Sequence, residues 1–433
     1  MMGGRDKKQV TDNRETKKYL DKHLKKSLLR FITCGSVDDG KSTLLGRLLF
    51  ETKTVFSDQF AQLQADSKKF GTQGDSIDYA LLLDGLSAEQ EQGITIDVAY
   101  RFFSTEKRKF IVADTPGHEQ YTRNMATGAS TADAAVILID ARKGILAQTK
   151  RHSYICHLFG IKHIIVAVNK MDLVTYEKLK FQAIAEDYKL FAESIGIVDL
   201  SFIPICGIHG DNIVSVSENM KWYKGSSLLK LLEDIKLEDS TTLSQPFRMP
   251  VQLVNRPNSD FRGISGKVAS GYISKNDEIS IFPSGKKTKV KEIISPSGSI
   301  NKSLPGQSIT LTFNDEIDCS RGHIISSVNA PLEISDQFDA MVVWMDEQPF
   351  VPGRAYNLKI GCLELQASCA QPKYKINTET NEHIATKNLE LNDIGNVILT
   401  TVKEIPFTSY QEDRGLGGFI LIDKVSNITV AAV

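Results

Sequence analysis

The stretch Phe31–Leu49 constrains the fold of this chain more than any other. It reads F-I-T-C-G-S-V-D-D-G-K-S-T-L-L-G-R-L-L, an apolar run, a glycine-containing loop and leucines at helical spacing. Residues 35–42 fit the pattern G-x-x-x-x-G-K-[ST], and their flanks predict a strand before the loop and a helix after it. A chance glycine-lysine turn is the alternative, but it does not require these flanks. The sequence therefore predicts a phosphate-binding loop.

The chemistry of such a loop follows from its residue types. Successive backbone N–H groups form an anion nest at the positive end of the helix, and Gly35 and Gly40 let the backbone approach phosphates closely. Lys41 supplies a cation to the terminal phosphates, and the Ser42 hydroxyl can bind Mg²⁺. The residues assigned to this site are Gly35, Ser36, Val37, Asp38, Asp39, Gly40, Lys41, Ser42 and Thr43.

Composition places the chain among ordinary globular proteins. Its 433 residues are enough for two or three domains, and its formal net charge of -1 gives no global reason to bind nucleic acid. The six cysteines are scattered without metal spacing, which fits a reducing cytoplasm. No apolar run is long enough for a membrane span. The polar, basic start, Met1–Lys26, is expected to be a tail with a short helix, either solvated or a docking element for a partner.

Strands and helices are expected to alternate in the first half of the chain. The expected strands are Phe110–Ala113, Ala134–Ile139, Ile164–Val168 and Phe202–Ile205, and the expected helices include Thr149–Phe159 and Lys178–Ser194. Such alternation predicts an α/β domain whose mostly parallel sheet has helices on both faces. The long polar segment Glu51–Gly93 interrupts it, and segments of this kind are usually functional or mobile.

From Gln245 onward short alternating strands replace the helical periodicity. The lysine-rich strand after the Ser284-Gly285 turn has no interleaved aromatic residues, so it is expected to be a solvated face rather than a nucleic-acid surface. Val328–Pro331 is expected to be a second linker. The expected order is a tail (1–27), an α/β domain that carries the phosphate loop (28–243) and two β-barrel domains (244–331 and 332–433).

Two further motifs indicate which nucleotide binds. Asp114-Thr115-Pro116-Gly117 is a D-x-x-G that ends a predicted strand, where the carboxylate can hold Mg²⁺ and the bare Gly117 N–H can read a γ-phosphate. Asn169-Lys170-Met171-Asp172 is an N-K-x-D. The Asp172 carboxylate can accept two parallel N–H donors, which guanine offers and adenine does not. Together with the phosphate loop, these motifs predict a GTPase.

Two residues are candidates for switching and hydrolysis. Thr95, within Gly93–Asp97, can bind Mg²⁺ while the γ-phosphate is present and release it afterwards, although an Ile-Thr-Ile run is equally the start of a strand. His118 directly follows the D-x-x-G and is the candidate that orients the attacking water. The other histidines, among them His152, His157 and His163, are interpreted as surface or core residues.

The motif D-T-P-G-H-E, the Gly93–Asp97 segment and the two trailing β-domains resemble the translational GTPase family, whose best-known member is elongation factor Tu. Longer stretches are similar to one branch, the large subunits of bacterial sulfate adenylyltransferases. These stretches are Gly35–Thr43, with Ser36 and Asp39 where elongation factors carry histidine, Asn124–Gly144, Val254–Gly263, Asp315–Gly322 and Gly418–Asp423.

The resemblance implies a GTPase subunit that works with a separate, smaller catalytic subunit in a heterodimer or higher assembly, without a membrane or nucleic acid. That partner converts ATP and sulfate to adenosine 5′-phosphosulfate and pyrophosphate, and GTP hydrolysis offsets the unfavourable reaction. The resemblance also implies GTP and Mg²⁺ as cofactors. It further implies an apolar gate of Val37 and Ile94 around His118.

The sequence departs from the family pattern at three places. Cys206-Gly207-Ile208 replaces the usual Ser-Ala at the base, so a serine hydroxyl is lost while the Gly207 N–H could still reach the guanine O6. Gln90 stands where arginine is frequent. Because the sequence ends at Val433 without an adenylylsulfate kinase, we expect no second enzyme activity.

Two classes of function share the expected GTPase domain. One is the regulatory GTPase of sulfate activation, and the other is a translation factor that delivers aminoacyl-tRNA. The barrel sequences and Asn124–Gly144 favour the first. Co-purification of a smaller subunit and stimulation of its reaction by GTP would distinguish them.

Overall fold

The computed structural model describes residues 26–53, 63, 67, 77–82, 98–118, 121–237, 243–258 and 261–432. The chain divides into two compact units, Met1–Lys236 and Leu237–Val433. Several predictions concern residues outside the described ones: nearly all of the N-terminal tail, most of Glu51–Gly93, Gln90, Ile94 and Thr95. None of the helices in the described part of the chain combines the length and hydropathy that a membrane span requires.

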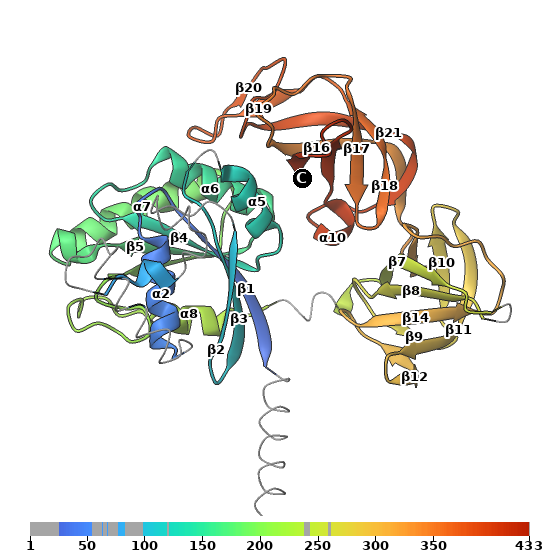
Figure 1. Ribbon diagram of the computed structural model, residues 1–433, viewed down its shortest axis with the longest axis horizontal. Coiled ribbons are helices and arrows are strands. Elements are labelled where there is room, and N and C mark those ends of the chain that lie inside the picture. Colours follow the sequence, from blue (N-terminus) through green and yellow to red (C-terminus); the bar gives the residue numbers. More distant parts are fainter. Residues whose placement is uncertain are drawn as a thin grey trace, which may run out of the picture. The chain divides into compact units, whose positions relative to one another are not determined.

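The first unit is built on a six-stranded sheet in the order β2-β3-β1-β4-β5-β6 (Figure 1). Its strands are β1 (Ser27–Cys34), β2 (Ala99–Ser104), β3 (Arg108–Asp114), β4 (Ala134–Asp140), β5 (His163–Asn169) and β6 (Leu200–Pro204). All neighbours pair in parallel except β2, which runs antiparallel to β3 at the edge. Every residue of β4 is buried, as expected for a central strand covered on both faces.

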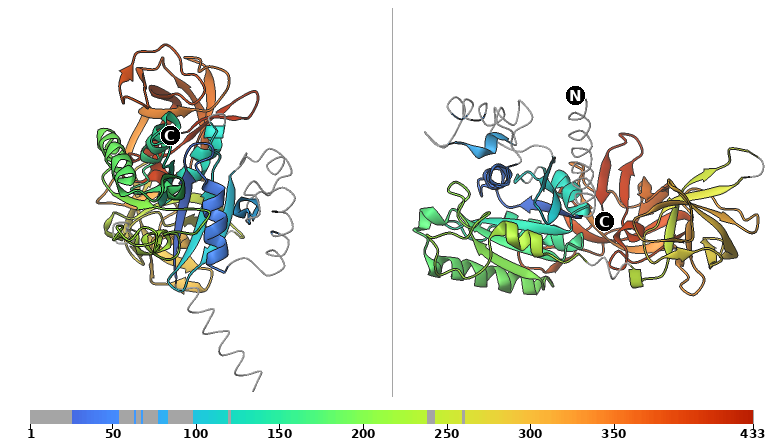
Figure 2. Two further views of the ribbon diagram at one scale, coloured as in Figure 1. Left: turned by 90° about the vertical axis from the view of Figure 1, so that its left-hand side faces the viewer. Right: turned by 90° about the horizontal axis from the view of Figure 1, so that it is seen from below.

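Helices cover both faces of this sheet, as the alternating sequence pattern predicts. They are α2 (Lys41–Glu51), α5 (Thr122–Ser130), α6 (Ala147–Leu158), α7 (Lys178–Ser194) and α8 (Leu228–Asp234), with the short 3-10 turns η1 (Tyr79–Leu82) and η3 (Met171–Val174). Figure 2 shows α2 and α7 on opposite sides of the strands. The buried residues of α7 are Phe181, Ile184, Tyr188 and Ala192, whose helical spacing explains why this face packs on β5 and β6.

Strand register brings the ends that carry the sequence motifs to one edge of the sheet. Thr33 of β1 lies opposite Asp114 of β3, and Asp140 of β4 lies opposite Asn169 of β5. In an open α/β sheet this carboxyl-terminal edge is where ligands bind. The phosphate loop, the D-x-x-G and the N-K-x-D therefore leave the sheet at the same edge, after β1, β3 and β5.

The second unit contains two closed antiparallel sheets. In the first, the order β10-β15-β7-β8-β14-β11 closes through a pairing of β10 with β11, while β12 extends it and β13 pairs with β9. Its strands are β7 (Arg248–Asn255), β8 (Gly263–Lys267), β9 (Ile273–Ser274), β10 (Glu278–Phe282), β11 (Lys286–Ser295), β12 (Gly298–Ile300), β13 (Lys302–Ser303), β14 (Ser308–Phe313) and β15 (Ile324–Ser327).

The second closed sheet has the order β16-β23-β22-β17-β18-β21, closed by β16 with β21 and extended by β19 and β20. Its elements are β16 (Glu333–Trp344), β17 (Ala355–Ile360), β18 (Leu363–Cys369), β19 (Tyr374–Ile376), β20 (His383–Ile384), β21 (Ile394–Phe407), the short helix α10 (Arg414–Gly417), β22 (Ile420–Asp423) and β23 (Thr429–Ala432). Trp344 lies in its core, with the rings of Phe350 and Tyr356 packed edge-on at 5.3 and 6.0 Å.

The fold prediction of an α/β phosphate-loop domain followed by two β-barrel domains is confirmed. The four domain limits drawn from the sequence stay a prediction. Residues of both barrels share a small apolar cluster of Phe282, Ile324, Leu332 and Leu416. Arg248 of β7 also forms an ion pair of 2.9 Å with Glu412, which follows β21.

Candidate nucleotide-binding site

The phosphate loop connects β1 to α2 and has the backbone geometry that its glycines predict. Gly40 caps α2 in the left-handed conformation (φ 89°), and a Cβ there would lie 2.6 Å from the Asn169 Nδ2 atom. Only glycine combines this conformation with this close approach. Within the loop the Asp39 Oδ2 atom accepts the Ser36 N–H at 2.6 Å, so Asp39 stabilises the turn itself.

Lys41 brings the phosphate loop and the D-x-x-G together. Its buried Nζ atom donates to the carbonyls of Gly35 (3.2 Å) and Ser36 (2.8 Å). A Cβ on Gly117 would lie 2.5 Å from the same Nζ atom. Burial lowers the pKa of Lys41, against the opposing effect of the Asp39 and Asp114 carboxylates. An ammonium group so poorly hydrated is ready to pair with an anion.

Two oxygen ligands suited to Mg²⁺ lie beside this ammonium group. The Ser42 Oγ donates to the Asp114 Oδ2 at 3.4 Å, and the Thr33 Oγ1 donates to the Asp114 Oδ1 at 3.0 Å. Burial raises the pKa of Asp114, while Lys41 opposes the rise. Hydroxyl and carboxylate oxygens are the hard ligands that Mg²⁺ takes beside phosphates. The described residues therefore fit the ion, although Thr95 lies outside them.

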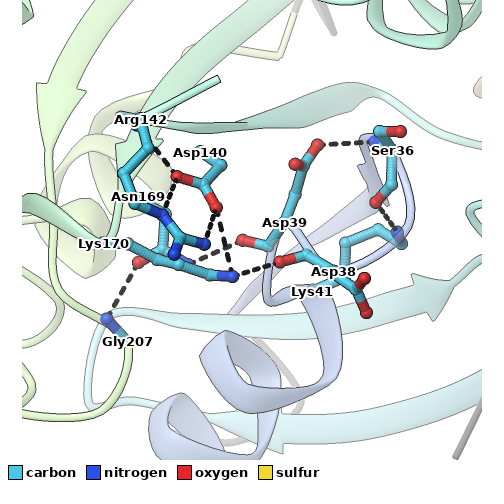
Figure 3. Close-up of polar contacts among 9 residues, drawn as sticks. All are labelled: Ser36, Asp38, Asp39, Lys41, Asp140, Arg142, Asn169, Lys170 and Gly207. Atoms are coloured by element: carbon cyan, nitrogen blue, oxygen red, sulfur yellow. Dashed lines mark hydrogen bonds and ion pairs between the residues drawn. The ribbon is translucent and has the colours of Figure 1, made fainter. Parts of the chain in front are cut away.

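The N-K-x-D residues hold the phosphate loop through its backbone (Figure 3). The Asn169 Nδ2 donates to the Asp39 carbonyl at 2.8 Å, and the Lys170 Nζ donates to the Asp38 carbonyl at 2.5 Å. The Asn169 Oδ1 accepts the N–H of Gly207 at 3.0 Å. Asn169 thus joins the phosphate loop to the segment that carries Gly207. Because the Gly207 N–H is directed at Asn169, its reading of the guanine O6 stays a prediction.

Asp140, at the end of β4, takes part in this network although no sequence motif assigned it a role. It accepts hydrogen bonds from the backbone and guanidinium of Arg142 at 2.7–3.1 Å and lies 3.2 Å from the Lys170 Nζ (Figure 3). Burial would raise the pKa of Asp140, but the bonds from Arg142 and Lys170 lower it to about 2. Asp140, like Asp114, follows an apolar strand in the sequence, and this position could have indicated that it belongs to the site.

The carboxylate of Asp172, which the sequence predicts to specify the base, has a thiol as its neighbour. The Cys206 Sγ donates to the Asp172 Oδ1 at 2.9 Å, so the thiol that stands where the family usually has a serine forms a hydrogen bond with this carboxylate. Burial and this hydrogen bond raise the pKa of Cys206 to about 12. The thiol therefore stays protonated and acts as a donor that orients Asp172.

The remaining predicted residues lie around this framework. The buried Thr115 donates to the Thr33 carbonyl at 2.6 Å, and the Ile208 carbonyl accepts from Arg47 at 3.0 Å. His118 follows Gly117 and is half-buried, with its ring 6.3 Å from that of Tyr121. The gate of Val37 and Ile94 stays a prediction, because Ile94 lies outside the described residues. Val37, Pro116 and Met171 lie within the phosphate loop, the D-x-x-G and the N-K-x-D.

His152 is a site residue that the sequence analysis missed. Its imidazole is buried in α6, and its Nδ1 accepts the N–H of Gly35 at 3.2 Å, while the Gln148 side-chain amide lies 2.9 Å from its Nε2. Burial, followed by the charges of Lys41 and Arg151, lowers the pKa of His152 to about 3. The neutral ring thus fixes the first residue of the phosphate loop. A contact across 117 residues of sequence leaves no local pattern.

The sequence matches two family models. The first is described as the elongation factor Tu GTP binding domain and covers residues 26–237. The second is described as GTP-eEF1A C-terminal domain-like and covers residues 337–433.

Three curated relatives match 96% of the chain. The bifunctional enzyme NodQ of Rhizobium sp. (strain N33) is 53% identical, and the match spans 64% of its length. Sulfate adenylyltransferase subunit 1 of Francisella tularensis subsp. novicida (strain U112) is 54% identical over 88% of its length. The protein of the same name from Saccharophagus degradans is 51% identical, also over 88%.

The buried imidazole predicts a pH dependence of stability. Because the pKa of His152 falls from about 6.5 in the unfolded chain to about 3 in the folded one, the unfolded state binds more protons in between, and stability falls as the pH drops. From pH 6.5 to 5 the loss from this group should be about 2 kcal/mol. The His152→Gln variant should lose less stability over the same pH range, because it lacks this titrating group. Urea unfolding at each pH measures this.

The control for this measurement is His383→Gln, which removes an exposed imidazole from the other unit and should retain the wild-type pH dependence. If stability depended equally on pH in the wild type and in His152→Gln, His152 would not be the buried neutral group that causes the loss.

Proposed function

We propose a function for the chain from one premise: it belongs to the sulfate adenylyltransferase subunit 1 family, within the elongation factor Tu-like GTPases. We infer that it is the GTP-hydrolysing subunit of an ATP sulfurylase. Its separate, smaller catalytic subunit would convert ATP and sulfate to adenylyl sulfate and diphosphate. The assembly would be a cytoplasmic heterodimer or a higher complex of such pairs.

The observation that supports the GTPase activity in this proposal is the arrangement of polar groups around Asp172. Its carboxylate is oriented by the Cys206 thiol at 2.9 Å, next to a phosphate loop that Asn169 and Lys170 bind. A carboxylate held in this way presents two acceptors to the N1–H and N2 amine of guanine, and an adenine base would leave them unpaired. These contacts support GTP as the nucleotide.

Hydrolysis would proceed by positioning and neutralisation, the usual contributions of a protein to phosphoryl transfer. The loop N–H groups and the Lys41 ammonium would stabilise negative charge on the β- and γ-phosphates. Ser42 and Asp114, with Thr95, would hold Mg²⁺, which neutralises developing charge on the phosphate oxygens when bound. His118 would hold the attacking water, behind the gate of Val37 and Ile94, and Gly117 would read the γ-phosphate.

Coupling requires that the GTP and GDP states differ in their affinity for the partner. A ligand shifts a conformational equilibrium only by its differential affinity for the two states. The D-x-x-G leads through His118 into the stretch before α5, and Gly117 adjoins Lys41. Loss of the γ-phosphate would therefore act first on this connection. We propose that the segment Glu51–Gly93 also contributes to the difference in partner affinity between the GTP and GDP states.

The test of this function uses the chain together with the smaller subunit from the same cell. The two should co-purify, and diphosphate release from ATP and sulfate should rise when GTP is added. A nonhydrolysable GTP analogue should not sustain this rise through many turnovers, because coupling needs hydrolysis. Absence of GTP stimulation, together with tight binding of aminoacyl-tRNA, would favour a translation factor instead.

His118→Ala should lower the rate of GTP hydrolysis by about 10²-fold or more. Its affinity for GTP should stay near the wild-type value, because water positioning acts only in the transition state. Single-turnover hydrolysis and equilibrium binding of a fluorescent GTP analogue measure the two quantities. His383→Ala is the matched histidine control. A fall in affinity as large as the fall in rate would make His118 a binding residue.

Asp172→Asn should weaken GTP binding and favour xanthosine triphosphate, since the new amide can donate to the 2-carbonyl of xanthine. We expect the preference for GTP over xanthosine triphosphate to reverse, which competition binding measures. Asp187→Asn, an exposed change on α7, is the charge-matched control. An unchanged base preference would show that the guanine pocket lies elsewhere.

A further inference from the structure

Three donor atoms of different chemistry converge beside the proposed guanine pocket. A carboxylate oxygen of Asp172, the Cys206 Sγ and a ring nitrogen of His209 all lie within 4.8 Å of one another. Bonds of about 2.0–2.3 Å to a tetrahedral zinc ion would place such atoms roughly 3.3–3.8 Å apart. The separations of the three atoms are therefore within about 1 to 1.5 Å of those that one shared ion requires.

The loop that carries Cys206 and His209 is fixed by its backbone. Arg47 of α2 donates to the carbonyls of Ile208 at 3.0 Å and His209 at 3.2 Å. Glu51 lies 2.6 Å from the Arg47 Nε and neutralises this charge. The cluster is thus preorganised, and the nearby guanidinium does not add a net positive charge that would repel a cation.

The three side chains of the cluster differ in their exposure to solvent. His209 is exposed, Asp172 is half-buried and Cys206 is buried. This order gives an incoming ion a first ligand at the surface and a thiol at the closed end. Among the described residues, no other group of histidine, cysteine and acidic side chains meets the same distance criterion.

We propose that Asp172, Cys206 and His209 bind a borderline divalent cation, with Zn²⁺ as the typical case, when the guanine pocket holds no nucleotide. The Cys206 thiol would give its proton to solvent as the sulfur-metal bond forms, and water would be the fourth ligand. Asp172 cannot serve the ion and the guanine base together, so the two exclude one another. Mg²⁺ prefers oxygen ligands and does not compete.

The exclusion rests on the proposed guanine pocket, whereas the cation site rests on the three side chains alone. The probe is Co²⁺, whose bond to a thiolate gives a charge-transfer absorption in the near ultraviolet. Titration of the nucleotide-free full chain, in a reductant that does not bind metals, should produce this band. Zn²⁺ and GDP should each remove it, and Mg²⁺ should not. No band would overturn the site.

Variants identify the ligands. Cys206→Ser should abolish the band, and His209→Gln should weaken Co²⁺ binding by about tenfold or more. Cys362→Ser, which removes a half-buried thiol in the second unit, should retain both band and affinity. Circular dichroism of each variant establishes that it folds. A wild-type band in folded Cys206→Ser, or unchanged affinity in His209→Gln, would contradict this ligand set.

GDP affinity is measured separately without added cation, by fluorescence of a labelled nucleotide. GDP that binds but leaves the Co²⁺ band unchanged overturns the exclusion. A chain that shows the band and binds no guanine nucleotide contradicts the proposed function, and the exclusion with it, while supporting the cation site. The two failures are therefore distinguishable.

Discussion

The side-chain amide of Asn169 joins the two halves of the nucleotide site. Its nitrogen donates to the phosphate loop at the Asp39 carbonyl, and its oxygen accepts from Gly207 in the base segment. The amide is buried, so a broken bond would leave a polar group without water at a cost of about 1–3 kcal/mol. Asn169, at the end of β5, therefore helps to fix the distance between the phosphate loop and the Gly207 segment.

Buried charge in the site is arranged so that each cation has a carboxylate near it. Lys41 lies close to Asp39 and Asp114, and Lys170 pairs with Asp140 at 3.2 Å. For Lys41 desolvation dominates, and its pKa is lowered. For Asp140 the hydrogen bonds dominate, and its pKa is lowered to about 2. The Lys41 ammonium group is therefore ready to bind an anion. The Asp140 carboxylate already has its hydrogen-bond partners and supports the position of Lys170.

The sequence predicted what depends on local pattern. The apolar runs predicted β3, β4 and β5 to within a few residues, and the helix expected at Lys178–Ser194 is α7. The motifs lie at one edge of the sheet because parallel strands end together. The sequence showed that Cys206 stands where the family usually has a serine. It did not show that the thiol forms a hydrogen bond with Asp172.

The missed residues act across the fold. His152 contacts Gly35 from α6, and Asp140 contacts Lys170 from the neighbouring strand. In the sequence, a histidine within a helix looks the same whether it packs in a core or accepts an N–H from a neighbouring loop. Only the contact between α6 and the phosphate loop distinguishes these cases, and that contact is a property of the tertiary structure.

The closed rings of the second unit limit how another chain can be recognised there. β10 pairs with β11 and β16 with β21, so each ring consumes its own strand-pairing groups. A partner cannot insert a strand into either closed ring, so pairing through the main chain would have to use strands that extend the rings, such as β12 and β20. In the first unit, β2 is an edge strand among the described strands, and it pairs with β3.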